Sequence, residues 1–473
     1  VQAGAAAIGI LVAILLSNID YRSLVNVWPV HVVLTWGLVL PTLVIRNVTI
    51  GPLTIGYNAG DTDNYSWYKL GGFTFQPTEL AKISFILTFA MHLNNVRSRL
   101  NEPKELGKLL LHLFVPIGII HIQGDDGTAI IYGIIGCCMM FAAGLSWKYI
   151  LGAAAAAGAA VLGAAYGVYR VGFYNKPTTQ VPSPADMPTR ECYRKAMGPD
   201  ADALARDRFE PVHITAQDGT PLAARYYHHA DGAPLAIIFH GYRGYATRDG
   251  LGGYTLCTAL GYNVLLPDQR AHGYSGGHTI TMGVKERYDA RDWAVWARSH
   301  FGPEVPIFLM GVSMGAATVV LAAGLSLPDN VCGVVADCGY TSPREITRKC
   351  LPEYLPGMPV GLTYAIGRLG AILFGRFDPE DADCTAAAAQ SKVPIFFVHG
   401  DADGFVPYEM GKRNYEACRA KGKKFLTVHG AEHAVSYYHD NAAYTAQVTD
   451  FLQDCLTRRG FVWPPEADKD KQA

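Results

Sequence analysis

The sequence carries no surplus of charge of either sign. Its 473 residues include 40 lysines and arginines and 41 aspartates and glutamates, which leaves a formal net charge of −1 at pH 7. A chain with this balance has no long-range field that would attract a nucleic acid or an anionic surface. We therefore expect no nucleic-acid partner.

Regularly spaced cysteines are also missing. The ten cysteines form no CxxC pair and no cysteine–histidine ligand pattern, and Cys137 and Cys138 lie inside an apolar run. Disulfide frameworks and zinc sites both depend on such spacings. The sequence therefore predicts neither of them, and no other motif calls for a metal or a cofactor.

Charged residues are scarce, at 17% of the chain, and half of all residues are hydrophobic. The apolar stretches cover 3–17, 27–45, 79–94, 108–122, 126–144 and 149–170. One crossing of a bilayer takes about 20 helical residues, so some of these runs are short for a span, and buried core helices are the alternative. So many runs before residue 172 nevertheless favour an all-α transmembrane region in contact with the lipid bilayer.

The last apolar run bears on how the chain is anchored. Its stretch "ILGAAAAAGAAVLGAAYGVY" is rich in alanine and glycine, as transmembrane helices are where they pack closely, and it predicts a transmembrane helix or a lone anchor over 149–172. The loop 95–108 is the most basic one between two spans, so the positive-inside tendency places it in the cytoplasm. Counting spans onward puts the later part of this multi-pass chain outside, whereas Arg170 and Lys176 favour the opposite orientation.

A proline-rich polar segment marks a domain boundary. "NKPTTQVPSPADMPTR" is typical of an extended linker, and we expect a linker over 173–204. Beyond it, short runs such as "LAIIFHG", "VPIFLMG" and "VPIFFVHG" alternate with helical ones. This alternation predicts a mostly parallel sheet with helices on both faces over 205–456. The charged tail, 457–473, should be flexible.

One serine lies where a strand-like run passes into a helical one. In "VPIFLMGVSMGAATVVLAAGL", Ser313 stands between Gly311 and Gly315. A GxSxG match alone is common by chance, but a serine on a sharp strand-to-helix turn is exposed as a nucleophile would be. Because a serine hydroxyl reacts poorly until a base takes its proton, a histidine and an orienting acid should accompany it.

Candidate partners follow Ser313 at the ends of later strand-like runs. Asp403 in "HGDADGFVP" and His433 in "HGAEHAVSY" come in the chain order that such a sheet requires. Asp337 in "VVADCGYTS" and Asp401 are competing acids. We expect Asp403 to be the acid and His433 the base.

When Ser313 attacks a carbonyl carbon, the carbonyl oxygen becomes an oxyanion, which would need two backbone N–H donors. Met314, directly after the serine, supplies the first. Tyr242 supplies the second, because it follows His240 and Gly241 at the end of an early strand-like run. An ordinary strand-ending turn is the alternative interpretation of His240 and Gly241.

These segments together resemble the α/β-hydrolase superfamily over about 205–456. The matching pieces are "FHGYRG", "LLPDQRAHGYSGG", "GVSMGA", "HGDADGFVP" and "GAEH". They are similar to those of bacterial serine aminopeptidase-like or dienelactone hydrolase-like esterases. The resemblance implies a metal-independent acyl transfer with Ser313 as nucleophile, Asp403 as acid and His433 as base, and a structural role for His272. The apolar, proline-interrupted segment 350–375 would then form a small helical lid, or an ordinary crossover helix.

The first 150 residues resemble a different family, the peptidoglycan-polymerising SEDS proteins such as RodA and FtsW. The similarity is carried by "GGFTFQPTELAKI", through Phe75, Gln76, Pro77, Glu79, Ala81 and Lys82. In "IQGDDGTAIIY", Gly124 and Asp126 depart from the family's pattern. The chain has room for only part of that family's set of spans and opens on Val1 instead of methionine, so we expect a truncated SEDS-like region over 1–150.

The sequence as a whole predicts a membrane-attached serine hydrolase that cleaves carboxylic esters or small acyl substrates through an acyl-enzyme intermediate. A serine peptidase is the nearest alternative, because nothing in the sequence distinguishes an ester from an amide leaving group. A SEDS-like glycosyltransferase fragment, or a scaffold in cell shape or cell division, is the alternative of a different class. A hydrolase fold that only binds is the third.

Overall fold

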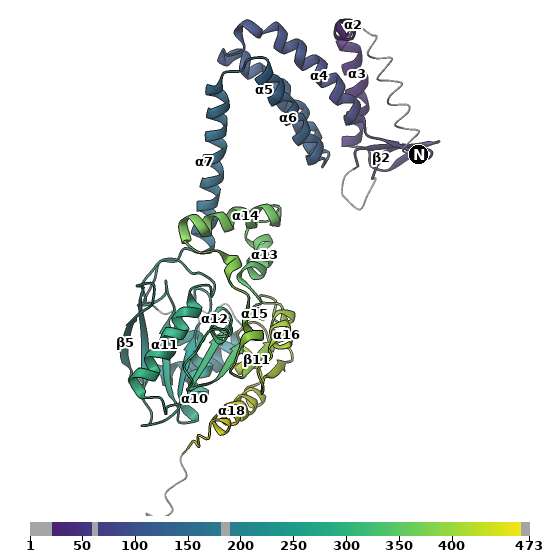
Figure 1. The fold of residues 1–473 in the computed structure, drawn as a ribbon. Helices are drawn as coiled ribbons and strands as arrows, with labels where there is room; N and C mark the ends of the chain where they lie inside the picture. The colour runs from purple at the N-terminus through teal and green to yellow at the C-terminus, as the bar shows by residue number, and fades with distance from the viewer. Residues whose placement is uncertain (1–20, 59–64, 181–189, 465–473) are drawn as a thin grey trace, which may run out of the picture. The chain divides into compact units, whose positions relative to one another are not determined.

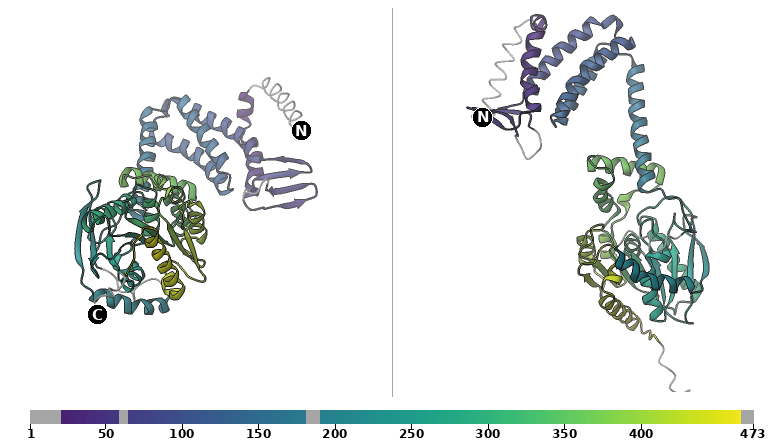
Figure 2. Two further views of the ribbon diagram at one scale, coloured as in Figure 1. Left: turned by 60° about the horizontal axis from the view of Figure 1, so that its bottom comes forward. Right: turned by 180° about the vertical axis from the view of Figure 1, so that it is seen from behind.

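The structure is a computed structural model that describes residues 21–58, 65–180 and 190–464. The chain forms two compact units, Val1–Gly158 and Ala159–Ala473, so the boundary between them falls inside one helix, α7 (Trp147–Gly172). The apolar run predicted over 3–17 lies outside the described residues. Each unit is described below by itself (Figures 1 and 2).

The first unit is mainly helical, and its longer helices coincide with predicted apolar runs. They are α2 (Tyr21–Asn26), α3 (Trp28–Val39) with the 3-10 turn η1 (Leu40–Leu43), α4 (Pro77–Asn95), η2 (Arg97–Arg99), α5 (Pro103–Ile122) and α6 (Asp126–Ala142). Phe85, Phe89 and Tyr132 form the centre of its core. Among the described residues, two helices, α5 and α7, are long and apolar enough to cross a bilayer. This supports association with a membrane.

This unit also contains a small sheet that the sequence analysis did not anticipate. Four antiparallel strands run in the order β1-β2-β3-β4, between α3 and α4. They are β1 (Val48–Ile50), β2 (Leu53–Tyr57), β3 (Trp67–Leu70) and β4 (Phe73–Phe75). The strands are too short and too exposed to give an apolar run, so a search for spans passes over them. The all-α description of the region therefore needs this addition.

The second unit is built on an eight-stranded sheet in the order β12-β11-β10-β9-β7-β8-β6-β5. The strands are β5 (Glu210–Thr215), β6 (Pro221–Tyr227), β7 (Leu235–Phe239), β8 (Asn263–Asp268), β9 (Ile307–Val312), β10 (Val331–Asp337), β11 (Ile395–Gly400) and β12 (Lys424–Val428). All neighbours pair in parallel except β6, which is antiparallel to both β5 and β8. The predicted mostly parallel sheet is confirmed, and the order is that of an α/β-hydrolase fold.

Helices cover both faces of this sheet. Alternate residues of one strand enter different cores: Ile237 joins the cluster formed with α11 (Glu286–Phe301) and α12 (Met314–Ala323), whereas Ile238 joins the cluster formed with α10 (Leu251–Ala259). Further helices of the unit are α8 (Glu191–Arg206), α9 (Ala246–Asp249), α15 (Cys384–Gln390), α16 (Tyr408–Ala417), α17 (Ser436–His439) and α18 (Asn441–Arg458). The strands β7 to β11 are buried on both faces, which explains why they are continuously apolar in the sequence.

A helical excursion follows β10. It contains α13 (Pro343–Tyr354), α14 (Val360–Gly370), the π-type turn η4 (Ala371–Gly375) and the 3-10 turn η5 (Pro379–Asp381). This is the segment for which the sequence predicted a helical lid, and below "the lid" means residues 343–375. Figure 1 shows it at one end of the hydrolase unit, beside the last turns of α7.

The linker predicted over 173–204 needs a correction. Its second half forms most of α8, which buries Met197 and Leu204 against the hydrolase core, and Tyr174 pairs with Thr279 in an isolated β-bridge. A count of prolines and polar residues missed this helix because only one of its faces is apolar. Residues 181–189 lie outside the described part.

The turn at Ser313 depends on the absence of a side chain at Gly315. A Cβ atom there would collide with the carbonyl oxygen of Phe239 in β7, a backbone atom that cannot move away. We expect Gly315→Ala to lower the thermal midpoint of the hydrolase unit or to prevent its folding, since overpacking a tight core costs about 1–3 kcal/mol or more. Gly198→Ala is the control, because the helical position 198 is open. Equal midpoints for both variants in thermal unfolding would contradict the prediction.

Candidate active site

Ser313 occupies a strained turn between β9 and α12. Its backbone has φ 56° and ψ −115°, a conformation that costs a non-glycine residue free energy and persists only where the surroundings enforce it. Here the Ser313 N–H donates to the Asp337 carbonyl oxygen at 2.8 Å, and a Cβ on Gly311 would collide with the backbone of Gly315. The turn places the serine side chain at the carboxyl end of the sheet, as the GxSxG pattern predicted.

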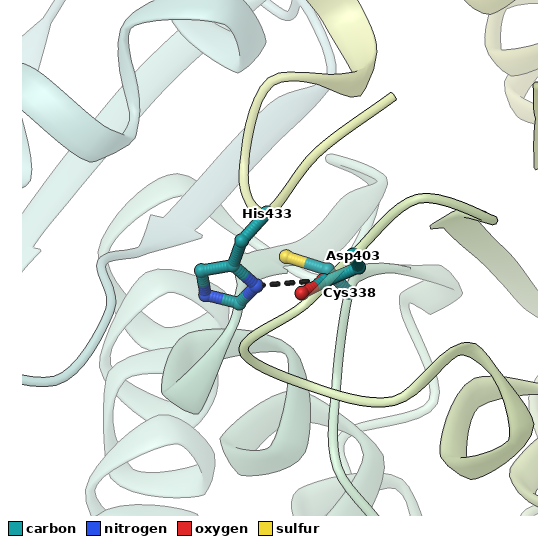
Figure 3. A group of neighbouring side chains, drawn as sticks. All are labelled: Cys338, Asp403 and His433. Carbon is teal, nitrogen blue, oxygen red and sulfur yellow. Dashed lines mark hydrogen bonds and ion pairs between the residues drawn. The ribbon is translucent and has the colours of Figure 1, made fainter. Parts of the chain in front are cut away.

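A hydrogen-bonded relay leads away from this serine. His433 Nε2 lies 2.9 Å from Ser313 Oγ, and His433 Nδ1 lies 2.7 Å from Asp403 Oδ2. Asp403 follows β11 and His433 follows β12, so two neighbouring strand ends bring them together (Figure 3). The structure thus assembles the three residues that the sequence singled out, in the geometry of a nucleophile, a base and an orienting acid.

The Asp403 carboxylate is held in its charged form. Its Oδ1 accepts the backbone N–H groups of Phe405 and Val406 at 2.9 and 2.8 Å, and its Oδ2 also lies 3.4 Å from His399 Nε2. Burial by itself raises the pKa of Asp403, but hydrogen bonds from His399 and His433 outweigh it and lower the pKa below its ordinary value. An ionised Asp403 can fix His433 with its Nδ1 protonated and its Nε2 free to accept a proton.

The two competing aspartates take other roles. Asp337 is buried, and its Oδ1 accepts the Ser436 hydroxyl at 3.1 Å. Burial raises the pKa of Asp337 to about 6. Asp401 lies at the surface, where its carboxylate lies 2.7 Å from His429 Nδ1 and accepts the backbone N–H of Gly430. Neither of the two carboxylates is the one that bonds the Nδ1 of His433.

The two residues predicted to donate N–H groups to an oxyanion belong to segments close to Ser313. Met314 is the first residue of α12, so its N–H has no partner within the helix. Gly241 lies close to Ser313, since a Cβ built on it would sit 3.5 Å from the serine Cβ, and Tyr242 follows directly. Asp249 orders this loop by accepting the Gly241 N–H at 3.0 Å. These are the two positions predicted for an oxyanion hole.

His240 and His272 are buried structural residues. The His240 Nδ1–H donates to the Gly241 carbonyl oxygen at 2.8 Å, and its Nε2 accepts the Gln269 N–H at 2.9 Å, which joins the ends of β7 and β8. His272 packs edge-on against His240 with ring centroids 4.6 Å apart, and burial lowers its pKa to about 3. Both rings therefore remain neutral near pH 7, and the structural role expected for His272 fits its position.

The lid contacts the loop after β11, which carries Asp403, through residues that the sequence analysis missed. Lys349 of α13 donates to the Gly404 carbonyl oxygen at 2.9 Å, and its ammonium lies 5.4 Å from the centroid of the Phe405 ring. Phe405 in turn packs on the His433 ring at 5.0 Å. Neither Lys349 nor Phe405 belongs to a motif. Phe405 lies inside the quoted "HGDADGFVP" segment, but the sequence analysis assigned it no role. Only the folded structure shows that both residues contact the site.

Cys338 lies next to the acid and the base. Its sulfur and the donor atoms of Asp403 and His433 lie within 4.8 Å of one another, and this is the one group in the described residues that could hold a metal ion by spacing (Figure 3). Burial and the nearby carboxylates of Asp337 and Asp403 raise the pKa of the Cys338 thiol well above its ordinary value. A protonated thiol is a poor ligand, and the other two residues already bond each other. The donor set therefore suits the relay better than a metal.

In the first unit, the two SEDS-like segments lie in contact. Gln76 donates from its amide to the Asp125 carboxylate, which also caps α6 by accepting the Thr128 N–H at 3.1 Å. Lys82 pairs with Glu79 at 2.7 Å on α4. Asp126, one of the positions that depart from the family's pattern, pairs with His121 at 2.6 Å.

Comparisons with family models divide the chain in the same way. Residues 1–195 match the model described as "Cell cycle protein", which covers the FtsW, RodA and SpoVE proteins. Residues 237–377 match the "alpha/beta hydrolase fold" and 378–459 the "Prolyl oligopeptidase family". The two-part resemblance predicted from the sequence is confirmed. The first match extends past the expected limit at residue 150 and includes all of α7.

Individual relatives match only part of the chain. YqkD of Bacillus subtilis, an uncharacterised protein, is 29% identical over 197 residues, which are 41% of this chain and 63% of YqkD. A probable peptidoglycan glycosyltransferase FtsW of a Geobacter species is 37% identical over 87 residues, which are 18% of this chain and 24% of that FtsW. The chain therefore spans less than two thirds of the length of both relatives.

Among solved structures, the esterase Pf2001 of Pyrococcus furiosus superposes with a TM-score of 0.46 at 22% identity. The superposition covers 59% of this chain and 98% of the esterase.

The relay predicts different effects for two aspartates on one loop. Asp403→Asn should lower kcat on the order of 10⁴-fold, because an amide no longer fixes the tautomer of His433. Asp401→Asn, two residues away and exposed, should leave kcat within about threefold. Steady-state hydrolysis of a chromogenic ester by the purified full chain measures both. A larger loss in Asp337→Asn than in Asp403→Asn would reassign the acid.

The buried Asp337 should affect stability as a function of pH. Its pKa is about 6 in the folded protein and about 4 in the unfolded chain, so the folded form holds its proton more tightly. As the pH rises from about 4 to about 6, this group should lower the free energy of unfolding by up to roughly 1.4 kcal/mol per pH unit. Above about pH 6 it should lower the free energy of unfolding no further. Asp337→Asn should remove this dependence. The measurement is the difference in Tm between wild type and variant from pH 4 to 8, and a constant difference would contradict the prediction.

Proposed function

We propose that the protein is a membrane-attached serine hydrolase that cleaves carboxylic esters through an acyl-enzyme intermediate. The observation that carries the proposal is the continuous relay from Ser313 Oγ through His433 to the buried Asp403, at 2.9 and 2.7 Å. The α/β-hydrolase fold supplies the context in which such a relay performs acyl transfer.

In the first half-reaction, Ser313 Oγ attacks the ester carbonyl carbon while His433 Nε2 takes the hydroxyl proton. The carbonyl oxygen becomes an oxyanion, which the N–H groups of Tyr242 and Met314 stabilise, each contributing about 3 kcal/mol. When the tetrahedral intermediate collapses, the bond to the leaving alkoxide breaks, and His433 gives that oxygen its proton. The alcohol leaves, and the acyl group remains on Ser313.

The second half-reaction repeats these steps with water. His433 takes a proton from the water, whose oxygen attacks the acyl carbon, and the returning proton restores the Ser313 hydroxyl as the carboxylic acid leaves. Asp403 stays ionised throughout and stabilises the imidazolium form of His433. All of these roles are supplied by protein groups alone.

Amide cleavage is a second candidate. The match of residues 378–459, which contain both Asp403 and His433, to the prolyl oligopeptidase family favours it. An amide nitrogen leaves only after it is protonated, so a peptidase would depend more strongly on His433 as an acid. Parallel assays with an ester and an anilide of the same acyl group distinguish the two activities.

A role in peptidoglycan polymerisation is the candidate of a different class. The match of residues 1–195 to the cell cycle protein family favours it, and residues 1–150 would then bind a lipid-linked disaccharide. This activity would not depend on Ser313. Polymerisation that persists in Ser313→Ala would assign it to the first unit.

A fluorophosphonate probe tests the serine mechanism directly. The serine oxygen bonds to the phosphorus of the probe while fluoride leaves, so only an activated serine becomes labelled. We expect membranes that contain the full-length wild-type chain to give a fluorescent band on a gel, and Ser313→Ala to give none. Hydrolysis of a soluble ester should fall on the order of a millionfold in kcat.

The control is Ser299→Ala, which changes an exposed serine on α11 and should keep the label. A well-folded wild-type chain without a label would overturn the hydrolase proposal and leave a binding role. A label that persists in Ser313→Ala would assign the reaction to another residue.

A further inference from the structure

The outer face of the lid is apolar. Its exposed large side chains include Tyr354, Met358, Leu362, Ile372, Leu373 and Phe374, and these six are called the lid face below. Residues 354–374 are all described, and the only charged one among them, Arg368, is paired with Asp378 at 2.6 Å. A soluble protein rarely leaves an apolar surface of this kind uncovered, so the lid face is expected to have a partner.

The last turns of α7 pack directly on the lid. Gly367 and Gly370 of α14 lack the side chains that would collide with Val168 and with the Ala165 backbone. Phe374 contacts Tyr166 with ring centroids 5.1 Å apart. The α7 helix next to the lid also has exposed apolar residues, namely Leu162, Tyr166 and Val171.

The same end of α7 is hydrogen-bonded to the loop that contains Tyr242 and Arg243, called the oxyanion loop below. The Tyr242 hydroxyl donates to the Gly172 carbonyl oxygen at 2.7 Å, and Arg243 donates to the carbonyl oxygens of Val171 and Tyr174 at 2.7 and 3.1 Å. These bonds satisfy carbonyl groups that a helix end leaves without partners. Burial raises the pKa of Tyr242, so the phenol keeps the proton that it donates. Within the hydrolase unit, α7, the lid and the oxyanion loop thus form one connected assembly.

The dimensions of α7 indicate what covers the lid face. Its 26 residues give a helix about 39 Å long, more than the roughly 30 Å of a hydrocarbon core. Its buried residues are Ala165 and Tyr169, both in the last turns. The apolar residues that precede them are therefore not buried by the described part of the chain and need an apolar environment. Two exposed basic residues adjoin these segments in the chain, Arg170 on α7 and Arg376 directly after the lid. Lysine and arginine are favoured at a membrane interface.

We propose that the lid face and the last turns of α7 lie in the bilayer surface, and that the active site takes its ester from the lipid phase. The substrate class is then a long-chain carboxylic ester of a membrane amphiphile, with the acyl chain entering under the lid. This inference rests on the proposed serine hydrolase activity and specifies its substrate. Ser313 is only 7% exposed, so a substrate must enter the fold to reach it.

The first experiment places the lid face without using activity. The full chain is reconstituted in phosphatidylcholine vesicles with the photocrosslinker p-benzoylphenylalanine in place of Leu373, or in place of Val295 on α11. These two side chains are similarly exposed, at 49% and 47%. Irradiation should crosslink a radiolabelled phosphatidylcholine to position 373 and not to position 295. Absence of a lipid adduct at position 373 would overturn the proposal.

The second experiment tests the substrate class with two esters that share one leaving group. 4-Methylumbelliferyl oleate partitions into the vesicles, and 4-methylumbelliferyl butyrate stays in water, with rates expressed per fluorophosphonate-labelled enzyme. The double variant Leu362→Gln and Leu373→Gln should lower the ratio of oleate to butyrate hydrolysis at least tenfold. Val295→Gln, the matched control, should leave the ratio unchanged.

The outcomes separate this inference from the function on which it rests. Serine-dependent hydrolysis of butyrate without hydrolysis of oleate overturns the inference and leaves the hydrolase proposal intact, as does an unchanged ratio in the lid variant. Hydrolysis of neither ester by the labelled wild type overturns both. If the lid variant loses its label because it misfolds, the crosslinking result decides alone.

Discussion

The close approach of backbone at Ser313 is the constraint on which the rest of the hydrolase unit depends. A positive φ angle at a serine is unfavourable, and it is maintained because Gly311 and Gly315 let β9, α12 and the end of β7 come together without side chains between them. That approach also sets Gly241 beside the serine and leaves the N–H of Met314 free at the helix start. The free energy stored in the turn is offset by a continuously apolar core on both faces of the sheet.

Each buried carboxylate of the site has a pKa that depends on how many hydrogen-bond donors surround it. Asp403 has two backbone N–H groups and two histidines, so it stays charged. Asp337 is equally close to the site but has fewer hydrogen-bond donors, so burial raises its pKa. The chemistry of the relay thus depends less on residue type than on the loop after β11, which directs its N–H groups at one side chain.

The lid joins two features that are far apart in the sequence. Lys349 connects it to the loop that holds Asp403 and Phe405, and Gly370 connects it to α7. Through Tyr242, the same helix is bonded to the oxyanion loop. A change in the surroundings of α7 would therefore reach both the lid and the loop that contains Tyr242 through contiguous contacts.

The sequence alone indicated strands β7 to β12 of the large sheet, the longer helices of the first unit, and the three members of the relay, because apolar period, glycine spacing and chain order are local signals; it did not indicate β5 and β6. It left Asp337 as a competing acid and missed β1–β4, α8, His399 and Lys349. Those depend on the tertiary structure: short exposed strands and one-sided helices leave weak patterns, and the choice between two aspartates is made by hydrogen bonds from distant parts of the chain. The packing of the lid on α7 was likewise decided only by folding, since contacts between Gly370 and Ala165 join residues some 200 positions apart.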